Sequence, residues 1–211
     1  MKYTISVQKL IDLSVEENLV PDAKFHYRWQ EFSDWQFNAL KQIGLEPQHF
    51  LLDVGCGPMR LGMQAIPYLE DGHYFGIDAF LPYISLGKKI LSELEIHENY
   101  GVLDSKNFEF EKFGVKFDFA IAQSVFTHLS LSQIQTCVAS LKRVMKANSK
   151  LLFTYLVRNS PIGFLYDNRQ PMVYSAFCDD RFFNQIALEY NITFSMSHIN
   201  HPTQSVGIFQ F

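Results

Sequence analysis

Short apolar runs that alternate with amphipathic helical patterns constrain this fold more than any other feature of the sequence. The run HFLLDVG breaks at a glycine and is followed by a helical pattern over residues 59–69. The run HYFGID ends in an acid and is followed by a helical pattern over residues 81–94. The same order continues with NYGVL, KFDFAIAQS, a helical pattern over residues 132–145, and KLLFTYLV. Continuous apolar strands between such helices are typical of a parallel sheet covered on both faces, so the sequence predicts an α/β fold with a doubly wound, mostly parallel sheet.

Both ends of the chain depart from this alternation. Residues 34–43 form a helical pattern that stops at Gly44, and residues 179–190 form another that begins with acids. The last two apolar segments, ITFSMSHI and QSVGIFQF, are joined only by NHPT, so they can pair only as an antiparallel hairpin. We expect an N-terminal helical cap or lid over residues 1–44 and a main domain over residues 45–211.

Composition narrows the classes of partner. The 211 residues include 18 Lys and Arg against 22 Asp and Glu, so the net charge of −4 disfavours a broad basic face for nucleic acid. No apolar run reaches the roughly 18 residues that a membrane span needs, and the first residues lack a signal-peptide core. Three cysteines without CxxC spacing, and no H-E-x-x-H pattern, indicate neither disulfides nor a metal. We expect a cytoplasmic protein that uses a small-molecule substrate, without nucleic acid, membrane insertion or metal; the sequence leaves the oligomeric state open.

A glycine-containing turn follows the first predicted strand in LLDVGCGPMRLG. Gly55 and Gly57 allow the backbone to approach a ligand closely, and the helix predicted from Met59 would add unpaired amides at its start. A dinucleotide-binding loop with the pattern G-x-G-x-x-G would have a third glycine where this chain has Arg60, so that template is broken. The turn therefore indicates a ligand site of a different kind.

Two acids lie beside this turn in the predicted sheet. Asp53 lies inside the strand before the glycines, and Asp78 ends the next strand, where a carboxylate can accept hydrogen bonds from both hydroxyls of a ribose. Turn chemistry for the glycines and a helix cap for Asp78 are the structural alternatives. Two carboxylates around one site suit a ligand that has a ribose and a positive charge but no pyrophosphate.

The four segments LLDVGCGPMRLG, YFGIDAF, KFDFAIAQSVFTHL and LKRVMKANSKLLFTYL occur in an order that resembles the class I S-adenosylmethionine-dependent methyltransferases, over roughly residues 45–211. The resemblance implies a seven-stranded sheet with its last strand antiparallel, which agrees with the predicted hairpin. The loop departs from the common pattern, because GCGPMR stands where a third small residue is usual.

The same resemblance implies a set of cofactor contacts. The methionine end of S-adenosylmethionine would lie against Gly55, Cys56 and Gly57, with Asp53 supporting this loop. Asp78 would bind the ribose, and Ala79 and Phe80 would lie beside the adenine. The remaining predicted cofactor residues are Arg60 in the loop, Asn107 (or Asp104 in its place) at the adenine amine, and Gln123 and Ser124 after the fourth strand.

Two histidines are the candidates for a general base, which an alcohol acceptor would require. His128 follows the fourth strand, near the transferred methyl group in the predicted fold, and a capping or packing role is the alternative. His201 lies in the turn between the last two strands, where a solvated turn residue is the alternative. Cys56 is predicted to fill the loop rather than act as a nucleophile.

Two further segments suit substrate contacts. In AKFHYRWQEF, the side chains of His26, Tyr27 and Arg28 suit a lid over a site, and helix packing on the domain is the alternative. The second set lies in or after the fifth strand and consists of Tyr155, Arg158 and Tyr174.

The function that we predict is methyl transfer from S-adenosylmethionine to a small molecule, with a sugar or glycan-linked hydroxyl or oxyanion as the acceptor and a place in polysaccharide biosynthesis. This acceptor follows from a narrower resemblance of GCGPMRLGMQAIPYL, HYFGID and IAQSVFTHL to bacterial small-molecule methyltransferases found with glycan synthesis. A protein or RNA methyltransferase is the alternative enzyme. A non-catalytic module that binds S-adenosylmethionine and a dinucleotide oxidoreductase are alternatives of other classes.

Overall fold

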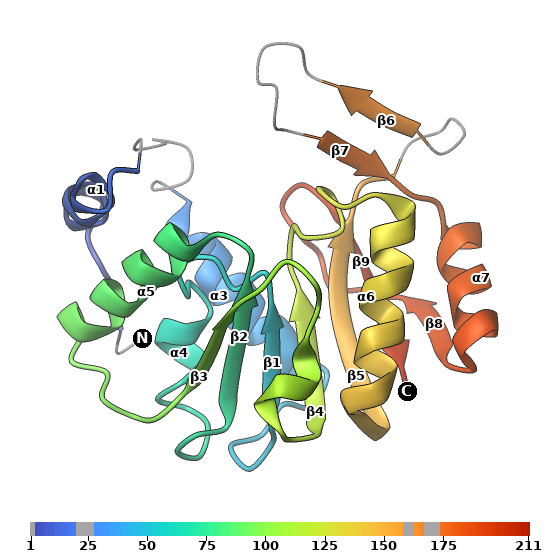
Figure 1. The fold of residues 1–211 in the computed structure, drawn as a ribbon, viewed down its shortest axis with the longest axis horizontal. Helices are drawn as coiled ribbons and strands as arrows, with labels where there is room; N and C mark the ends of the chain where they lie inside the picture. Colours follow the sequence, from blue (N-terminus) through green and yellow to red (C-terminus); the bar gives the residue numbers. More distant parts are fainter. Residues whose placement is uncertain (1–2, 20–27, 158–162, 167–173) are drawn as a thin grey trace. The chain divides into compact units, whose positions relative to one another are not determined.

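The computed structural model describes residues 3–19, 28–157, 163–166 and 174–211 (Figure 1), with the backbone alone over 163–166 and 174–177. The chain forms two compact units, Met1–Asn107 and Phe108–Phe211. Each unit is described by itself below.

The first unit holds three parallel strands and the helices that connect them. Its elements in chain order are α1 (Val7–Glu16), α3 (Trp29–Gln42), β1 (Leu51–Val54), α4 (Gly62–Ala65), β2 (Tyr74–Asp78), α5 (Leu81–Glu93) and β3 (Gly101–Asp104). The strands lie in the order β3-β2-β1, and Asp78 at the end of β2 is in register with Asp104 at the end of β3. The carboxyl ends of these two strands therefore each carry an acid.

The second unit changes from parallel to antiparallel pairing. Its elements are the 3-10 helix η1 (Phe110–Phe113), β4 (Phe117–Ala122), α6 (Leu131–Val144), β5 (Met145–Tyr155), β6 (Gly163–Tyr166), β7 (Tyr174–Phe177), α7 (Asp180–Tyr190), β8 (Thr193–Met196) and β9 (Ser205–Gln210). β4 and β5 are parallel, whereas β9 is antiparallel to both β5 and β8. β6 and β7 pair with each other as a separate antiparallel hairpin.

The predicted fold class is confirmed. Seven strands make a mostly parallel sheet, and its C-terminal strands β8 and β9 form the predicted antiparallel hairpin, joined by residues 197–204. Among the described residues, no helix has the length and apolar character that crossing a membrane requires.

Helix caps fix the starts of α6 and α7, and aromatic side chains pack α7 against the strands of the second unit. Ser130 caps α6 in a reciprocal capping box with Gln133, and Asp179 caps α7 through the backbone N–H of Phe182. Phe153 on β5 packs against Phe183 on α7 and Phe209 on β9, with ring centroids 4.8 and 4.9 Å apart. All three rings are fully buried, so part of the high phenylalanine content forms the core that joins α7 to the sheet.

The helix predicted over residues 59–69 is the main error of the sequence analysis. Only Gly62–Ala65 is α-helical, and Met59, where the predicted helix begins, has a positive φ of 54° that a helix does not tolerate. The expected row of helix-terminal amides at the glycine loop is therefore absent from this described segment. The sequence analysis also did not predict α1, η1 and the β6–β7 hairpin.

The N-terminal helices belong to the first unit. Salt bridges join α1 to α5, with Lys9 and Glu93 3.0 Å apart and Lys89 2.8 Å from Glu17. The predicted boundary at residue 44, and a role of residues 1–44 as a cap or lid, remain predictions.

Gly207 on β9 has no room for a side chain. A Cβ there would lie 2.5 Å from Cζ of Phe153, whose ring is held by its aromatic neighbours. We expect Gly207→Ala to lower the free energy of unfolding by about 1–3 kcal/mol through overpacking, measured by urea denaturation. The exposed Gln210→Ala on the same strand is the control and is expected to stay within about 0.5 kcal/mol of the wild type. A Gly207→Ala protein as stable as the control would contradict the packing described.

Candidate functional site

The loop after β1 has a backbone conformation that glycine favours. Gly55 and Gly57 have φ values of 68° and 52°, in the left-handed region. A Cβ on Gly57 would meet no atom within 4 Å, so space is open beside this part of the loop. The loop thus offers bare backbone next to room for a ligand.

Hydrogen bonds hold the loop against the end of β2. The backbone N–H groups of Gly55 and Cys56 both donate to the carbonyl oxygen of Ile77, at 2.8 and 3.0 Å. The N–H of Gly57 donates to Oδ2 of Asp78 at 2.8 Å. The carboxylate predicted to bind a ribose is therefore fixed directly beside the glycine loop.

Asp78 is oriented at both of its oxygens. Its Oδ1 accepts a hydrogen bond from the N–H of Phe80 at 2.9 Å, while Oδ2 accepts from Gly57. Partial burial raises the pKa of Asp78, and the hydrogen bonds from backbone amides oppose that rise. A carboxylate offers about four lone-pair positions, so with the backbone amides of Gly57, Ala79 and Phe80 around it, Asp78 can still accept a hydrogen bond from a ligand hydroxyl.

Two glycines outside the loop allow its neighbours to approach, and the sequence analysis did not find them. A Cβ on Gly76 in β2 would lie 2.9 Å from Sγ of Cys56, and a Cβ on Gly87 in α5 would lie 2.9 Å from the backbone of Pro58. Both contacts are too short for a real Cβ. The only sequence signal was a glycine in the interior of a strand and of a helix, where it otherwise weakens the element.

Cys56 is a packing residue of this loop. Its side chain is buried against Gly76. Burial raises the pKa of its thiol well above the ordinary value, and the nearby charges of Asp53 and Asp78 raise it further. The thiolate, which is the nucleophilic form, is therefore disfavoured.

Asp53 lies inside β1, two residues before Gly55. It is 2% exposed, and its Oδ2 accepts a 2.6 Å hydrogen bond from the hydroxyl of Tyr74, a partner that the sequence analysis missed. Burial raises the pKa of Asp53 to about 7, against the opposing effects of the Tyr74 hydrogen bond and the positive charge of Arg60. Asp53 is thus a buried residue of the core, and its role in supporting the loop stays a prediction.

Arg60 links the loop to α3. Its guanidinium lies over the rings of Phe32 and Trp29, and its carbonyl oxygen accepts a 2.8 Å hydrogen bond from Ser33 Oγ. Burial lowers the pKa of Arg60 to about 10, and the charge of Asp53 opposes that change. Arg60 thus contacts helix α3 and also lies near the carboxylate of Asp53.

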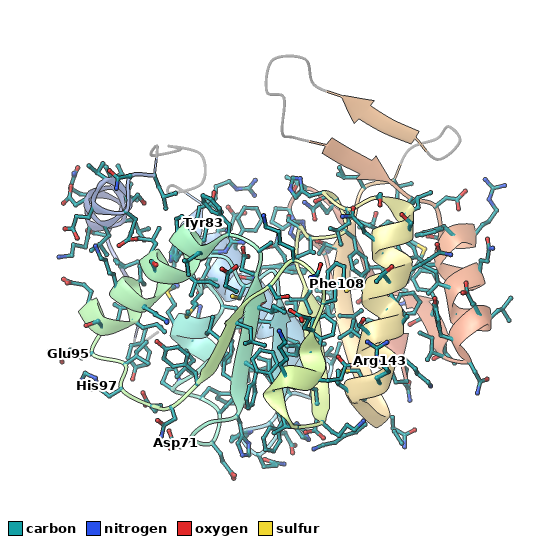
Figure 2. The ribbon with its side chains drawn as sticks, viewed as in Figure 1. Asp71, Tyr83, Glu95, His97, Phe108 and Arg143 are labelled. Carbon is teal, nitrogen blue, oxygen red and sulfur yellow. The ribbon has the colours of Figure 1, made fainter. Side chains whose placement is uncertain are left out.

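The residues predicted to lie beside the adenine are on the surface of the first unit. Phe80 is 46% exposed and packs edge-on against Tyr83, which projects from the start of α5 (Figure 2). Ala79, Asp104 and Asn107 are also exposed. The structure does not choose between Asp104 and Asn107.

In the second unit, Gln123 and Ser124 follow β4 directly and lie in a polar cluster. The Ser124 backbone N–H donates to Oγ1 of the buried Thr154 at 2.8 Å, and its φ is 58°. Its Oγ lies 2.8 Å from the side-chain nitrogen of Gln123 and 2.7 Å from that of Gln204. The sequence analysis missed Thr154 and Gln204, because nothing in their local pattern separates them from ordinary strand residues.

The two histidines differ in their surroundings. His128 is exposed in a turn closed by a 2.9 Å hydrogen bond from its N–H to the Val125 carbonyl. His201 is half-buried, and its Nε2 lies 3.3 Å from the side-chain nitrogen of Gln123. Of the two, His201 is the one that the structure brings to Gln123.

The predicted substrate residues are only partly described. Tyr155 is fully buried and donates its hydroxyl to Oδ1 of Asp180 at 2.9 Å, so it holds α7 to β5. Arg28 pairs with Glu31 at the start of α3. His26, Tyr27 and Arg158 lie outside the described residues, and for Tyr174 only the backbone in β7 is described.

Comparison with known proteins agrees with the resemblance to methyltransferases seen in the sequence. Residues 52–151 match the family described as a methyltransferase domain. The chain is similar in structure to magnesium protoporphyrin IX methyltransferase from Synechocystis PCC 6803, solved with bound SAM, with a TM-score of 0.67, 12% identity and 98% of each chain covered.

Two further solved structures have the same fold. One is 1,6-didemethyltoxoflavin-N1-methyltransferase from Burkholderia thailandensis, solved with 1,6-didemethyltoxoflavin and S-adenosylhomocysteine (TM-score 0.67, 11% identity, 97% of this chain and 85% of that chain). The other is a S-adenosylmethionine-dependent methyltransferase from Clostridium acetobutylicum ATCC 824 (TM-score 0.61, 9% identity, 97% of each chain).

Residues 52–151 thus match a methyltransferase domain, and the fold is that of solved methyltransferases, in agreement with the resemblance seen in the sequence. The family match, together with similar solved structures that hold SAM or SAH, supports an enzyme with S-adenosylmethionine as its cofactor. The loop itself fits this cofactor, because Gly57 has open space beside it and the Asp78 carboxylate lies at its edge.

Removal of the Asp78 carboxylate tests the ribose contact. We expect Asp78→Ala to weaken the binding of S-adenosylmethionine by roughly 5- to 150-fold, since a charged acceptor for hydroxyl groups is lost. Isothermal titration calorimetry measures the change, and the exposed Glu70→Ala serves as a control of equal charge change in the same unit. Unchanged affinity in Asp78→Ala, with a normal unfolding transition, would remove Asp78 from the site.

The raised pKa of Asp53 makes stability depend on pH. Between 3.8, its ordinary value, and about 7, the folded state holds a proton that the unfolded state has lost. Stability from this group is therefore present at low pH and lost as the pH rises to about 7, by about 1 kcal/mol per pH unit. We expect urea denaturation between about pH 5 and pH 8 to show this slope in the wild type and a smaller one in Asp53→Asn, which keeps an acceptor for Tyr74. Equal slopes in the two proteins would show that Asp53 titrates normally.

Proposed function

We propose that the enzyme transfers the methyl group of S-adenosylmethionine to an oxygen of a small molecule. Two solved structures that the chain resembles are methyltransferases named for small molecules, magnesium protoporphyrin IX and 1,6-didemethyltoxoflavin. A net charge of −4 disfavours an RNA acceptor. The observation that carries the proposal is the glycine loop with open space beside Gly57 and an oriented carboxylate at Asp78.

A sugar or glycan-linked hydroxyl or oxyanion is our proposal for the acceptor. It rests on the narrower resemblance of the loop, β2 and the segment after β4 to methyltransferases of glycan synthesis. Participation in polysaccharide biosynthesis is part of the same proposal. An acceptor that is already an oxyanion would need no base, whereas a hydroxyl would have to lose its proton.

The proposed roles of the loop residues are those that the family resemblance implies, and the open space at Gly57 and the orientation of Asp78 support them. Asp78 would accept hydrogen bonds from the ribose, and Gly55 and Gly57 would leave room for the methionine end. Exposed Phe80 would lie beside the adenine. Because displacement at a sulfonium methyl needs chiefly alignment and exclusion of water, such positioning can supply roughly 7–11 kcal/mol of the barrier reduction.

The remaining predicted cofactor residues stay in the proposal as well. Ala79 and one of the two residues Asn107 and Asp104 would contact the adenine from the exposed end of β3 and the turn after β2. Cys56 and Asp53 would act by shaping the loop, in agreement with their burial. Arg60 lies in the same loop. Gln123 and Ser124 are proposed as contacts because they follow β4 directly, at the position that the resemblance assigns to methyl transfer.

Residues 1–44 are proposed to act as a cap or lid. Their described helix α3 contacts the glycine loop through the bond from Ser33 Oγ to the Arg60 carbonyl, and Gln64 Nε2 donates to Asp34 at 2.7 Å. A segment fastened to the cofactor loop is suited to respond to cofactor binding. The proposed substrate residues remain His26, Tyr27, Arg28, Arg158, Tyr155 and Tyr174. Because Tyr155 is fully buried, it would act indirectly, by packing in the core.

Two measurements separate the proposal from its alternatives. Calorimetry with S-adenosylmethionine and S-adenosylhomocysteine tests the cofactor, and a radiolabelled methyl-transfer assay over pools of small-molecule, glycan, protein and RNA acceptors tests turnover. Methyl label in a small molecule would support the proposal. Label in protein or RNA would favour the alternative enzyme, and binding without transfer to any pool would favour a non-catalytic module.

His128 is the proposed general base for a hydroxyl acceptor. We expect His128→Ala to lower kcat by about 10²-fold or more while the affinity for S-adenosylmethionine changes less than twofold, because general-base catalysis contributes roughly 10²–10⁴-fold. Steady-state kinetics with the identified acceptor measure kcat, and calorimetry measures the affinity. The exposed His198→Ala in the same unit is the control. Normal kcat in His128→Ala would leave deprotonation to the acceptor itself or to another residue.

A further inference from the structure

We propose that His201 is a positioning residue, which donates a hydrogen bond from Nε2–H to the side-chain oxygen of Gln123 and does not accept the proton of the acceptor. The proposal rests on the proposed role of Gln123 and Ser124 at the methyl-transfer site. It replaces the earlier expectation that the His201 imidazole could serve as a general base.

The first step of the argument is the environment of Nδ1 of His201. The backbone N–H groups of Thr203 and Gln204 donate to this atom at 3.1 and 3.0 Å. Pro202 has no N–H, so these are the first two amides after the histidine, and both point back to its ring. An atom that accepts two hydrogen bonds cannot also carry a proton, because that proton would face two other N–H groups. The basic lone pair of the neutral imidazole is therefore already in use.

The second step fixes the other ring nitrogen. When Nδ1 is an acceptor, the proton of the neutral imidazole lies on Nε2, which makes Nε2 a donor. The side-chain position of Gln123 that faces it at 3.3 Å has been assigned as nitrogen, which would also be a donor. The oxygen and nitrogen of a glutamine amide are told apart only by their hydrogen-bond partners. The ring thus requires the oxygen of Gln123 on this side.

In the third step, the contacts of the Ser124 hydroxyl agree with placing the side-chain oxygen of Gln123 toward His201. The same Gln123 position lies 2.8 Å from Ser124 Oγ, and the side-chain nitrogen of Gln204 lies 2.7 Å from it. With oxygen at that position of Gln123, the Ser124 hydroxyl donates to Gln123 and accepts from Gln204. Each contact then pairs one donor with one acceptor, which the opposite orientation of Gln123 does not achieve at His201.

A functional consequence follows for the groups near the transferred methyl. With its oxygen held by His201 and Ser124, Gln123 has its amino group on the side away from the imidazole. His201 and Ser124 would thereby fix the orientation of the Gln123 side-chain amide at the proposed methyl-transfer site. If the acceptor needs a base, the imidazole left for that role among the two predicted histidines is that of His128.

Nuclear magnetic resonance on the full-length protein labelled with ¹⁵N-histidine tests the tautomer directly. We expect a long-range ¹H–¹⁵N spectrum near neutral pH to show His201 with a pyridine-type Nδ1 and a pyrrole-type Nε2. His201→Asn identifies these signals by their disappearance. The opposite tautomer, or a ring protonated on both nitrogens, would overturn the proposal whether or not the protein binds a cofactor.

A double-mutant cycle tests whether His201 acts through Gln123. In His201→Asn, the side-chain oxygen can still accept from the backbone amides of Thr203 and Gln204, while the Nε2–H donor is lost. We expect this variant to unfold near the wild-type temperature and to bind S-adenosylhomocysteine about threefold or more weakly in calorimetry, with no further loss when Gln123 is already alanine. An equal loss in the Gln123→Ala background, or no loss in either, would contradict the positioning role. Failure of the wild type to bind S-adenosylhomocysteine would count against the proposed function instead, and the tautomer would still be decided by the spectrum.

Discussion

The contact of the Asp78 carboxylate with the backbone of the glycine loop is the interaction on which the proposed cofactor site depends. One oxygen accepts from Gly57 and the other from Phe80, so the same side chain fixes the loop after β1 and the turn after β2. The alternation of strand and helix places both turns at the carboxyl ends of neighbouring parallel strands. The oriented carboxylate then has remaining lone pairs for a ligand beside open space at Gly57.

Burial raises the pKa values of the two acids beside the glycine loop and of the Cys56 thiol within it, and their surroundings differ. Asp53 lies in the core with Tyr74 as its partner, and its pKa is raised to about 7, whereas Asp78 is partly exposed and receives backbone hydrogen bonds. The Cys56 thiol is kept protonated by the same burial and the same acids. The loop is thereby built to bind and orient, and no nucleophile is present in its described part. This agrees with methyl transfer from a sulfonium, which depends chiefly on alignment.

Periodicity predicted the parts of the fold whose sequence carries a regular pattern. The apolar runs gave β1 to β5, and the short link NHPT gave the antiparallel β8–β9 pair. The helix expected from Met59 was wrong, since only Gly62–Ala65 is α-helical, and no composition rule reveals the positive φ at Met59. In the site, Asp78 and Gly57 were visible because strand ends and glycines mark them. Tyr74, Gly76 and Gly87 act through contacts across the fold, so they could not be predicted from spacing. His201 was a candidate from its place in the last turn, but the hydrogen bonds at its Nδ1 could not be predicted from the sequence pattern.

A crystal structure of the protein with S-adenosylhomocysteine tests the central claim most directly. The account predicts that the ribose hydroxyls lie within hydrogen-bond distance of the Asp78 carboxylate, and that the homocysteine end lies against the backbone of Gly55 and Gly57. A ligand bound elsewhere, or an Asp78 side chain turned away from the ribose, would contradict it.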